Sequence, residues 1–272
     1  MMRKDNLPDQ RKGGSSAGRR RACRGPIWKA MLATMFAVPA SAEPEVGIVT
    51  FTVDNVTSEF FAKYMPEFFG RDIPGTMFGQ TKPITGAPGD ISWENVRSLQ
   101  QFGWEFGAHG FTHAYMLSKA SDEVLEMELG VPAAQILRAT GIYPETFASP
   151  NGDYDERVLD RARFYYNAHF RGWGNEGINL FDRTDHFRIN REQVANTKSV
   201  DEICAEMERA GRDGYWLVYI WHRVVDIPTY EYENSVDQFL GVLDCADRLR
   251  DAGIIRLMSA RDAIGVVPDT PR

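Results

Sequence analysis

The sequence predicts an α/β protein built on a parallel β-sheet, and two observations carry this prediction. Between residues 46 and 268, short apolar runs rich in β-branched residues alternate six or seven times with stretches that have helical apolar spacing. No low-complexity tract, internal repeat or Pro/Gly/Ser-rich linker interrupts this region. We therefore expect a single domain whose sheet is wound as a barrel or as an open sheet.

The expected strands and helices follow one another along the chain. The strand-like runs cover residues 46–53, 75–80, 104–109, 146–150, 165–170, 215–222 and 254–258. The helix-like stretches cover residues 58–69, 92–103, 121–140, 155–163, 199–211, 235–253 and 259–265. Ser199 and Glu202 have the spacing of a capping box, which marks a helix start. In a barrel, the catalytic residues lie at the C-terminal ends of such strands.

The first 42 residues differ from the rest and predict an export signal. A basic stretch, RRRACRGPIWK, leads into the apolar AMLATMFAV and then PASA, which resembles a cleavage site ending at Ala42. The apolar run is short for a membrane span. We expect residues 1–42 to direct export or membrane targeting, and residues 43–272 to form a domain that is periplasmic, bound to the cell envelope or secreted.

The charge and the cysteine content of the chain limit which classes of partner and which kinds of metal site are expected. Residues 1–42 hold nine of the 31 Lys and Arg but two of the 38 Asp and Glu, which leaves 22 basic against 36 acidic residues, a net charge of −14. Such an acidic chain argues against nucleic acid as a partner, and no stable protein partner is implied. Beyond Cys23, only Cys204 and Cys245 remain; both lie in helical stretches, so we expect free buried thiols and no cysteine zinc site.

Polar residues follow the ends of four expected strands. Asp54 and Asn55 end the first, His109 ends the third, Pro150 and Asn151 follow the fourth, and His222 ends YWLVYIWH. His113 lies four positions after His109, in HGFTH. Each residue alone is typical of a turn or of a hydrogen-bonded core, but their joint placement at one edge of a parallel sheet predicts a site.

The order of these motifs resembles that of the polysaccharide deacetylase family, also called the NodB-homology or carbohydrate esterase 4 family. The similar segments are TFTVDN, HGFTH, ASPNG and LVYIWH, within a resemblance that covers about residues 46–265. The resemblance implies a distorted (β/α)₇ barrel that removes N-acetyl groups from a polysaccharide such as peptidoglycan, chitin-like or poly-N-acetylglucosamine-like polymers. It also implies a divalent metal, for which we expect zinc.

The resemblance assigns a role to each residue. Asp54 would be the general base and His222 the general acid; Asn55, His109 and His113 would hold the metal; the Asn151 backbone N–H, after Pro150, would face the oxyanion. Amide hydrolysis needs an activated water, oxyanion stabilisation and an acid for the leaving amine. Two imidazoles one turn apart can converge on a zinc-class ion. A zinc-protease motif is excluded because Gly110, not Glu, follows the first histidine.

Three departures from the family pattern affect the expected chemistry. Asn55 replaces an aspartate, which removes one anionic ligand and weakens metal binding. Ala148 replaces the arginine that would accompany the base, so the Asp54 pKa would drift upward unless Arg188 or Arg191 substitutes. Asn151 replaces a tyrosine, which changes the pocket wall but keeps the backbone donor.

Two further functions stay open. Asn55 and Ala148 favour a hydrolase of the same fold that cuts another C–N bond without metal, as an amidase or imidase does. A non-catalytic glycan-binding relative would instead use a cleft lined by aromatic residues such as Trp93, Phe111, Trp173 and Trp221. His169 and His186 have no assigned role.

Overall fold

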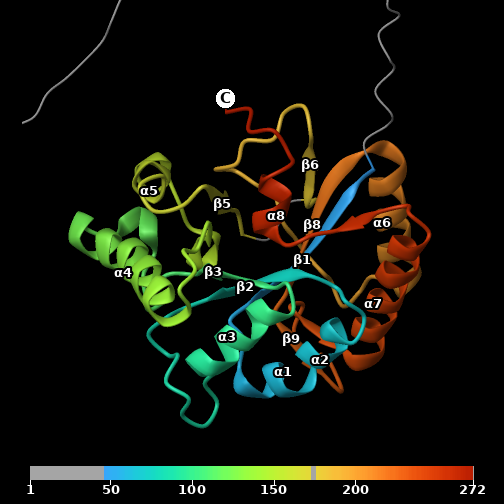
Figure 1. Cartoon of the computed structure of the whole chain (residues 1–272), viewed down its shortest axis with the longest axis horizontal. Coiled ribbons are helices and arrows are strands. Elements are labelled where there is room, and N and C mark those ends of the chain that lie inside the picture. The colour runs from blue at the N-terminus through green and yellow to red at the C-terminus, as the bar shows by residue number, and fades with distance from the viewer. Residues whose placement is uncertain (1–45, 173–175, 272) are drawn as a thin grey trace, which may run out of the picture. The chain divides into compact units, whose positions relative to one another are not determined.

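A computed structural model describes residues 46–172 and 176–271, and these residues form a curled, mostly parallel sheet surrounded by helices (Figure 1). The sheet order is β5-β4-β3-β2-β1-β8-β6, with β11 paired to β1 and β7 paired to β8. The pairings are parallel except that of β6 with β8. The prediction of an α/β fold of the barrel type is confirmed, and the described strands form a curled half-barrel. The expected export signal, residues 1–42, lies outside the described residues.

The bounds of the elements agree closely with the apolar runs of the sequence. The sheet strands are β1 Ile48–Asp54, β2 Gly75–Gly79, β3 Glu105–Ala108, β4 Thr146–Ala148, β5 Ala168–Phe170, β6 Ile178–Leu180, β7 Glu192–Gln193, β8 Tyr215–Trp221 and β11 Arg256–Leu257. The short strands β9 Arg223–Val225 and β10 Glu233–Ser235 pair with each other. The helices are α1 Ser58–Lys63, α2 Met65–Phe69, α3 Trp93–Gln101, α4 Asp122–Thr140, α5 Glu156–Ala162, α6 Val200–Asp213, α7 Val236–Asp251 and α8 Ala260–Ile264.

Two features differ from the expected elements. The stretch 58–69 forms two helices because Pro66 lies in the first turn of α2, where it starts a new helix and cannot donate a backbone hydrogen bond to α1. The strands β6, β7, β9 and β10 were not expected, because runs of two or three residues show no apolar period. The expected capping box is present: Ser199 and Glu202 bond to each other's backbone at the start of α6.

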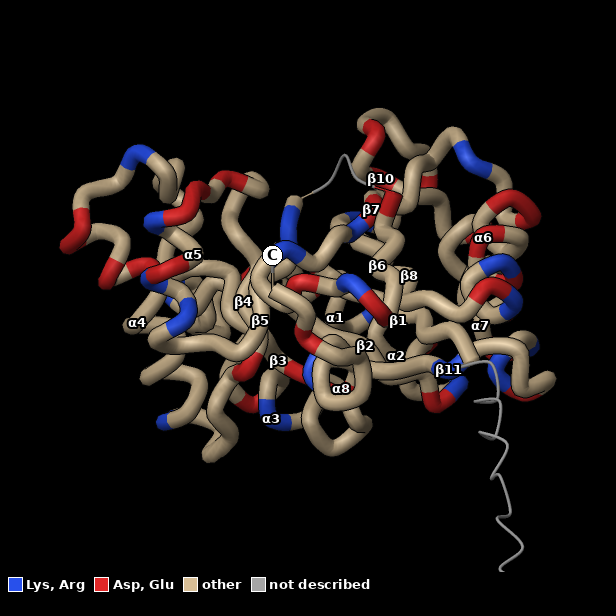
Figure 2. Tube along the Cα trace, turned by 90° about the horizontal axis from the view of Figure 1, so that it is seen from above, with Lys and Arg blue, Asp and Glu red and all other residues tan. Residues whose placement is uncertain are grey.

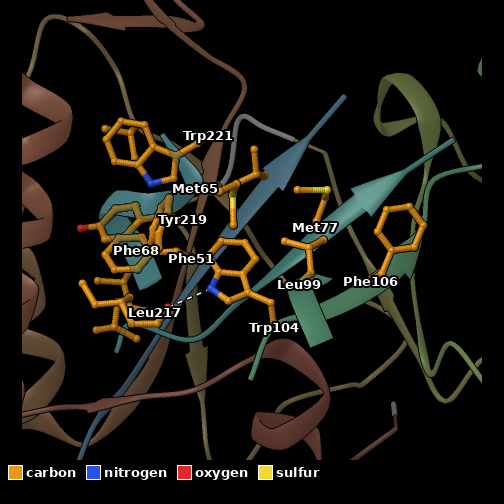
Figure 3. Close-up of a cluster of buried hydrophobic side chains, with 14 of the residues drawn as sticks. Phe51, Met65, Phe68, Met77, Leu99, Trp104, Phe106, Leu217, Tyr219 and Trp221 are labelled. Carbon is orange, nitrogen blue, oxygen red and sulfur yellow. Dashed lines mark hydrogen bonds between the residues drawn. The ribbon is translucent and has the colours of Figure 1, made fainter. Parts of the chain in front are cut away.

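Buried aromatic residues fill the space between the sheet and helices α2 and α7 (Figure 3). The ring of Phe68 from α2 meets Trp104 edge-on, with centroids 4.8 Å apart, and lies 6.0 Å from Phe51 of β1. Trp104 also donates its indole N–H to the Ile73 carbonyl at 2.9 Å, so its one polar atom is satisfied. This core supports strand β1, whose C-terminal end carries Asp54.

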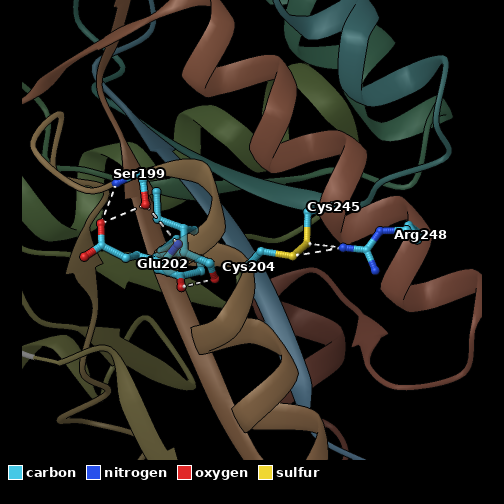
Figure 4. The surroundings of a disulfide bond; sticks show 7 residues. Ser199, Glu202, Cys204, Cys245 and Arg248 are labelled. Atoms are coloured by element: carbon cyan, nitrogen blue, oxygen red, sulfur yellow. Dashed lines mark hydrogen bonds between the residues drawn. A yellow bond between two sulfur atoms is a disulfide. The ribbon is translucent and has the colours of Figure 1, made fainter.

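Helices α6 and α7 pack side by side and are joined by a disulfide between Cys204 and Cys245 (Figure 4). The expectation of free thiols is therefore wrong. Although 41 residues separate the cysteines in the chain, their Cα atoms are 6.0 Å apart, within the range of ordinary disulfides. Both helices carry basic and acidic residues (Figure 2). No helix in the described residues has the length and apolar character needed to cross a membrane.

Candidate active site

A cavity of about 440 Å³ lies at the C-terminal ends of the parallel strands. Strand register brings its polar residues together: Val53 of β1 pairs with Trp221 of β8, so Asp54 and His222 follow at neighbouring strand ends. Gly79 of β2 pairs with Ala108 of β3, and His109 comes next. The cavity is lined by Asp54, Asn55, His109, His113, Ser149, Asn151, Gly152, Gly172, Arg191, Glu192, Gln193, Ala195, His222, Glu231 and Tyr232.

Asp54 is buried and pairs with Arg191 through two hydrogen bonds. Arg191 Nη1 donates to Oδ1 at 2.8 Å and Nη2 donates to Oδ2 at 3.0 Å. Arg191 is itself 1% exposed and is held by the Arg171 carbonyl at 2.7 Å and by the Thr52 hydroxyl at 3.2 Å. Of Arg188 and Arg191, the two arginines considered from the sequence, Arg191 is thus the one that contacts the expected general base, Asp54.

Burial acts to raise the pKa of Asp54, but the positive charge of Arg191 and the nearby His109 and His222 outweigh it and lower that pKa below its ordinary value. The upward drift expected for an unpartnered Asp54 does not occur. Arg188 lies elsewhere, in ion pairs with Glu156 and Asp185.

His109 presents one ring nitrogen to the cavity in a fixed tautomer. Its Nδ1–H donates to the Ala148 carbonyl at 2.8 Å, which leaves Nε2 as the nitrogen 4.0 Å from Asp54 Oδ2. Burial lowers the pKa of His109 to about 4, so the ring is neutral at pH 7. Ala148, which stands where the family pattern has an arginine, therefore orients His109 through its backbone carbonyl.

His113 stands beside His109, with ring centroids 4.9 Å apart and planes at 65°. The loop that joins them is fixed by the buried Glu128 of α4, whose Oε2 accepts the backbone N–H groups of Phe111 at 2.8 Å and Thr112 at 3.0 Å. Gly110 has φ 79°, and a Cβ there would meet Glu128 Oε2 at 2.8 Å. Only glycine lets the loop approach this carboxylate so closely.

Three residues of the cavity adopt left-handed backbone conformations. Asn55, His113 and Asn151 have φ of 58°, 59° and 56°, and Asp72 is the other non-glycine residue with positive φ in the ranges 46–172 and 176–271. Such conformations cluster where function constrains the backbone. Pro150, by contrast, is buried, and its Cγ would lie 3.1 Å from a Cβ placed at Gly110. It supports the loop behind Asn151.

The donor set fits a divalent cation that prefers nitrogen ligands. His109 and His113 can supply two imidazoles, and Asn55 can supply an amide oxygen. That oxygen accepts a hydrogen bond from the Gln80 side chain, which leaves its second lone pair available. Within the described ranges no three His, Cys, Asp or Glu side chains converge as a metal site, so the third ligand here would be neutral.

The structure adds contacts that the sequence analysis missed. His222 Nδ1–H donates to Gln193 Oε1 at 2.6 Å, and Ser149 donates its hydroxyl to His169 Nε2 at 2.8 Å. Gln193 belongs to the two-residue strand β7, which has no sequence signal. The His186 side chain binds the Val267 carbonyl at 2.9 Å, and the His186 backbone carbonyl accepts the backbone N–H of His169 at 2.8 Å.

Comparison with known proteins agrees with this arrangement of strands. Residues 41–166 match the family model described as polysaccharide deacetylase. The chain therefore contains a polysaccharide deacetylase domain. No curated protein sequence gives a significant match.

Solved structures share the fold of this polysaccharide deacetylase domain at low sequence identity. A T48 deacetylase with substrate is 16% identical with a TM-score of 0.56, over 83% of this chain and 94% of that one. A family 4 acetyl xylan esterase from Clostridium thermocellum, in complex with cobalt, is 13% identical with a TM-score of 0.53, over 81% and 93%. A carbohydrate esterase 4 pseudoenzyme from Bacillus anthracis, BA3943, is 12% identical with a TM-score of 0.56, over 85% and 68%.

These neighbours include both a deacetylase with substrate and a pseudoenzyme, so the polysaccharide deacetylase fold alone does not decide activity. The binding alternative predicted an aromatic cleft, and the structure corrects one of its members: Trp221 is fully buried in the core. Trp173 lies outside the described residues. Trp93 and Phe111 are half-buried and line a separate groove.

Proposed function

We propose that the protein is a metal-dependent deacetylase of an N-acetylated polysaccharide. One observation carries the proposal: Asp54, kept ionised by Arg191, shares a single cavity with His109, His113 and His222. A base with a lowered pKa, a pair of imidazoles that can bind a metal and a separate histidine at the neighbouring strand end are the groups that metal-assisted amide hydrolysis uses.

In this proposal each residue acts at a defined point. A bound divalent ion, for which we expect zinc, supplies the charge that lowers the pKa of water and polarises the acetyl carbonyl. His109, His113 and Asn55 would hold it. Asp54 accepts the proton of the attacking water, the backbone N–H of Asn151 donates to the oxyanion, and His222 donates a proton to the leaving amine. Arg191 positions Asp54, and Gln193 positions His222.

The substrate and the location are part of the same proposal. A cell-surface or exported glycan bearing N-acetyl groups suits a chain whose first 42 residues have the pattern of an export signal. N-terminal sequencing of the native protein should then give a start near Glu43 in a fraction outside the cytoplasm. An intact cytoplasmic chain that starts at Met1 would remove this part of the proposal.

Release of acetate tests the activity directly. The purified protein, loaded with zinc, should release acetate from chitooligosaccharides or peptidoglycan fragments, and a chelator should stop the release until zinc is added back. His109→Ala and His113→Ala should each lose metal and activity together, because each removes about a third of the protein ligands. Full zinc occupancy in both variants would exclude the site.

A metal-independent hydrolase of another C–N bond is the second candidate, favoured by the neutral Asn55 and by its bond to Gln80. Turnover of a small amide or imide that survives chelation would support it. A protein that binds glycans without releasing acetate, with or without zinc, would instead be a non-catalytic relative.

A further inference from the structure

A second hollow, which we call the basic groove, lies beside the loop that carries the two cavity histidines. It has a volume of about 540 Å³, and Phe111 of that loop forms part of its wall. The backbone N–H of Lys82 donates to the Phe111 carbonyl at 3.0 Å, which ties the groove to the segment between His109 and His113. The basic groove therefore adjoins the proposed active site.

The charge of the basic groove is opposite to that of the chain as a whole. Lys82, Arg97 and Arg138 line it, and its described lining includes no Asp or Glu. Arg97 uses one nitrogen to bind the Ala139 carbonyl at 3.0 Å, while all three side chains remain exposed. Three cations gathered on a chain whose residues 43–272 carry a net −14 indicate that an anionic group binds here.

Two buried polar atoms in the same groove have no hydrogen-bond partner among the described residues. They are the hydroxyl of Thr81, a residue 4% exposed, and the amide oxygen of Gln135. Buried polar groups are normally satisfied, so two orphans in one hollow point to a ligand that completes them. The Gln135 oxygen requires a donor, such as a sugar hydroxyl, whereas the Thr81 hydroxyl can donate to an anion.

A smaller hollow of about 170 Å³ borders both the catalytic cavity and the basic groove. Asn55 lines this hollow and the catalytic cavity, and Ile84 lines this hollow and the basic groove. The half-buried rings of Trp93 and Phe111 give the groove apolar faces on which a sugar ring can lie. The three hollows thus form a row along which we expect a glycan chain seated at Asp54 to extend.

We propose that the basic groove is a subsite for an acidic sugar of the substrate chain, so that the protein prefers a glycan in which N-acetylated and acid-bearing residues both occur. The acid is a carboxylate or a phosphate held by Lys82, Arg138 and the Thr81 hydroxyl. This inference rests on the proposed deacetylase function for its substrate class, but the groove binds its ligand through residues outside the catalytic set.

Binding measurements test the groove separately from catalysis. In a His222→Gln background, which slows turnover, we expect a hyaluronan hexasaccharide to bind on the order of ten times more tightly than neutral chitohexaose at low salt. The difference should shrink at 0.5 M NaCl because the groove cations are exposed. Lys82→Gln/Arg138→Gln should abolish the difference, whereas Arg256→Gln, a matched exposed cation at the opposite end of β1, should retain it. A phosphorylated chitohexaose distinguishes phosphate from carboxylate.

Thr81→Val provides a second test of the basic groove, one that does not change its charge. The variant should weaken binding of the preferred acidic oligosaccharide several-fold without lowering the thermal stability of the free protein, because the hydroxyl has no partner in the described residues. Equal binding of both acidic oligosaccharides and chitohexaose, or a preference that survives Lys82→Gln/Arg138→Gln, would overturn the inference. If the preference for acidic oligosaccharides holds but the zinc-loaded wild-type protein releases no acetate from any of these glycans, the deacetylase proposal fails and the acidic-sugar subsite stands.

Discussion

Arg191 and Asp54 form a buried, two-pronged ion pair although 137 residues separate them in the chain. The arginine reaches the base from the segment before β7, and not from β4, where the family motif would place it. Because both partners are almost completely buried, each depends on the other to balance its charge.

The first prediction concerns the stability of that pair. Arg191→Met should lower the free energy of unfolding by about 3–5 kcal/mol, since it leaves a buried carboxylate uncompensated. Asp54→Leu/Arg191→Met should be less destabilised, because no unpaired charge remains. The matched control is Arg188→Met, which breaks more exposed ion pairs and should cost about 1 kcal/mol or less. Urea unfolding measures all three; equal losses for Arg191→Met and Arg188→Met would contradict the pairing.

The second prediction separates the neighbours Asp54 and Asn55. Asn55→Asp should tighten metal binding, measured by competition with a chelator, because it adds an anionic oxygen. Asp54→Asn should stop acetate release while metal stays bound, because it removes the group that accepts the water proton. Circular dichroism of Asp54→Asn checks that the loss is not unfolding. Unchanged metal affinity in Asn55→Asp would show that position 55 does not touch the ion.

The third prediction concerns the neutral partner of His222. Burial lowers the pKa of His222, and Gln193 accepts its Nδ1–H without adding negative charge. Gln193→Glu should raise the pKa of His222, because a carboxylate stabilises the imidazolium. If His222 is the general acid, the basic limb of the kcat/KM profile should therefore move to higher pH, by about one unit.

Gln193→Ala is the control for this experiment. It removes the hydrogen bond without adding charge, so it should lower kcat through misorientation of the ring and leave the basic limb without the upward shift. A profile that does not move in Gln193→Glu would mean that His222 does not act as the acid.

The fourth prediction links His169 to stability in acid. Burial lowers the pKa of His169 to about 3, from 6.5, so the folded protein holds the ring neutral while the unfolded chain takes up a proton. The stabilisation is complete above about pH 6.5 and is lost as the pH falls toward 3. His169→Asn should make the free energy of unfolding less steep in this range, by up to about 1.4 kcal/mol per pH unit. An unchanged slope would show that His169 does not titrate on unfolding.

Much of the sheet could be predicted because its strands are apolar runs with polar residues at their ends. Asp54, His109 and His222 follow such runs directly, so the sequence places them at one edge of the sheet. Arg191 could not be chosen over Arg188, since three positions separate them and no periodic element spans that segment. Gln193 carried no signal for the same reason. Glu128 lies mid-helix in α4, and only the fold shows that its carboxylate binds the loop after His109.

The disulfide between α6 and α7 has a topological consequence for the site. The bond closes a covalent ring over residues 204–245, and this ring contains β8, His222 and the exposed Ile227 and Tyr230. A protease that cuts the exposed segment 227–230 opens this ring, but the disulfide between Cys204 and Cys245 still tethers the two fragments. The strand that presents His222 therefore remains attached to both neighbouring helices after a nick that would divide a reduced chain in two.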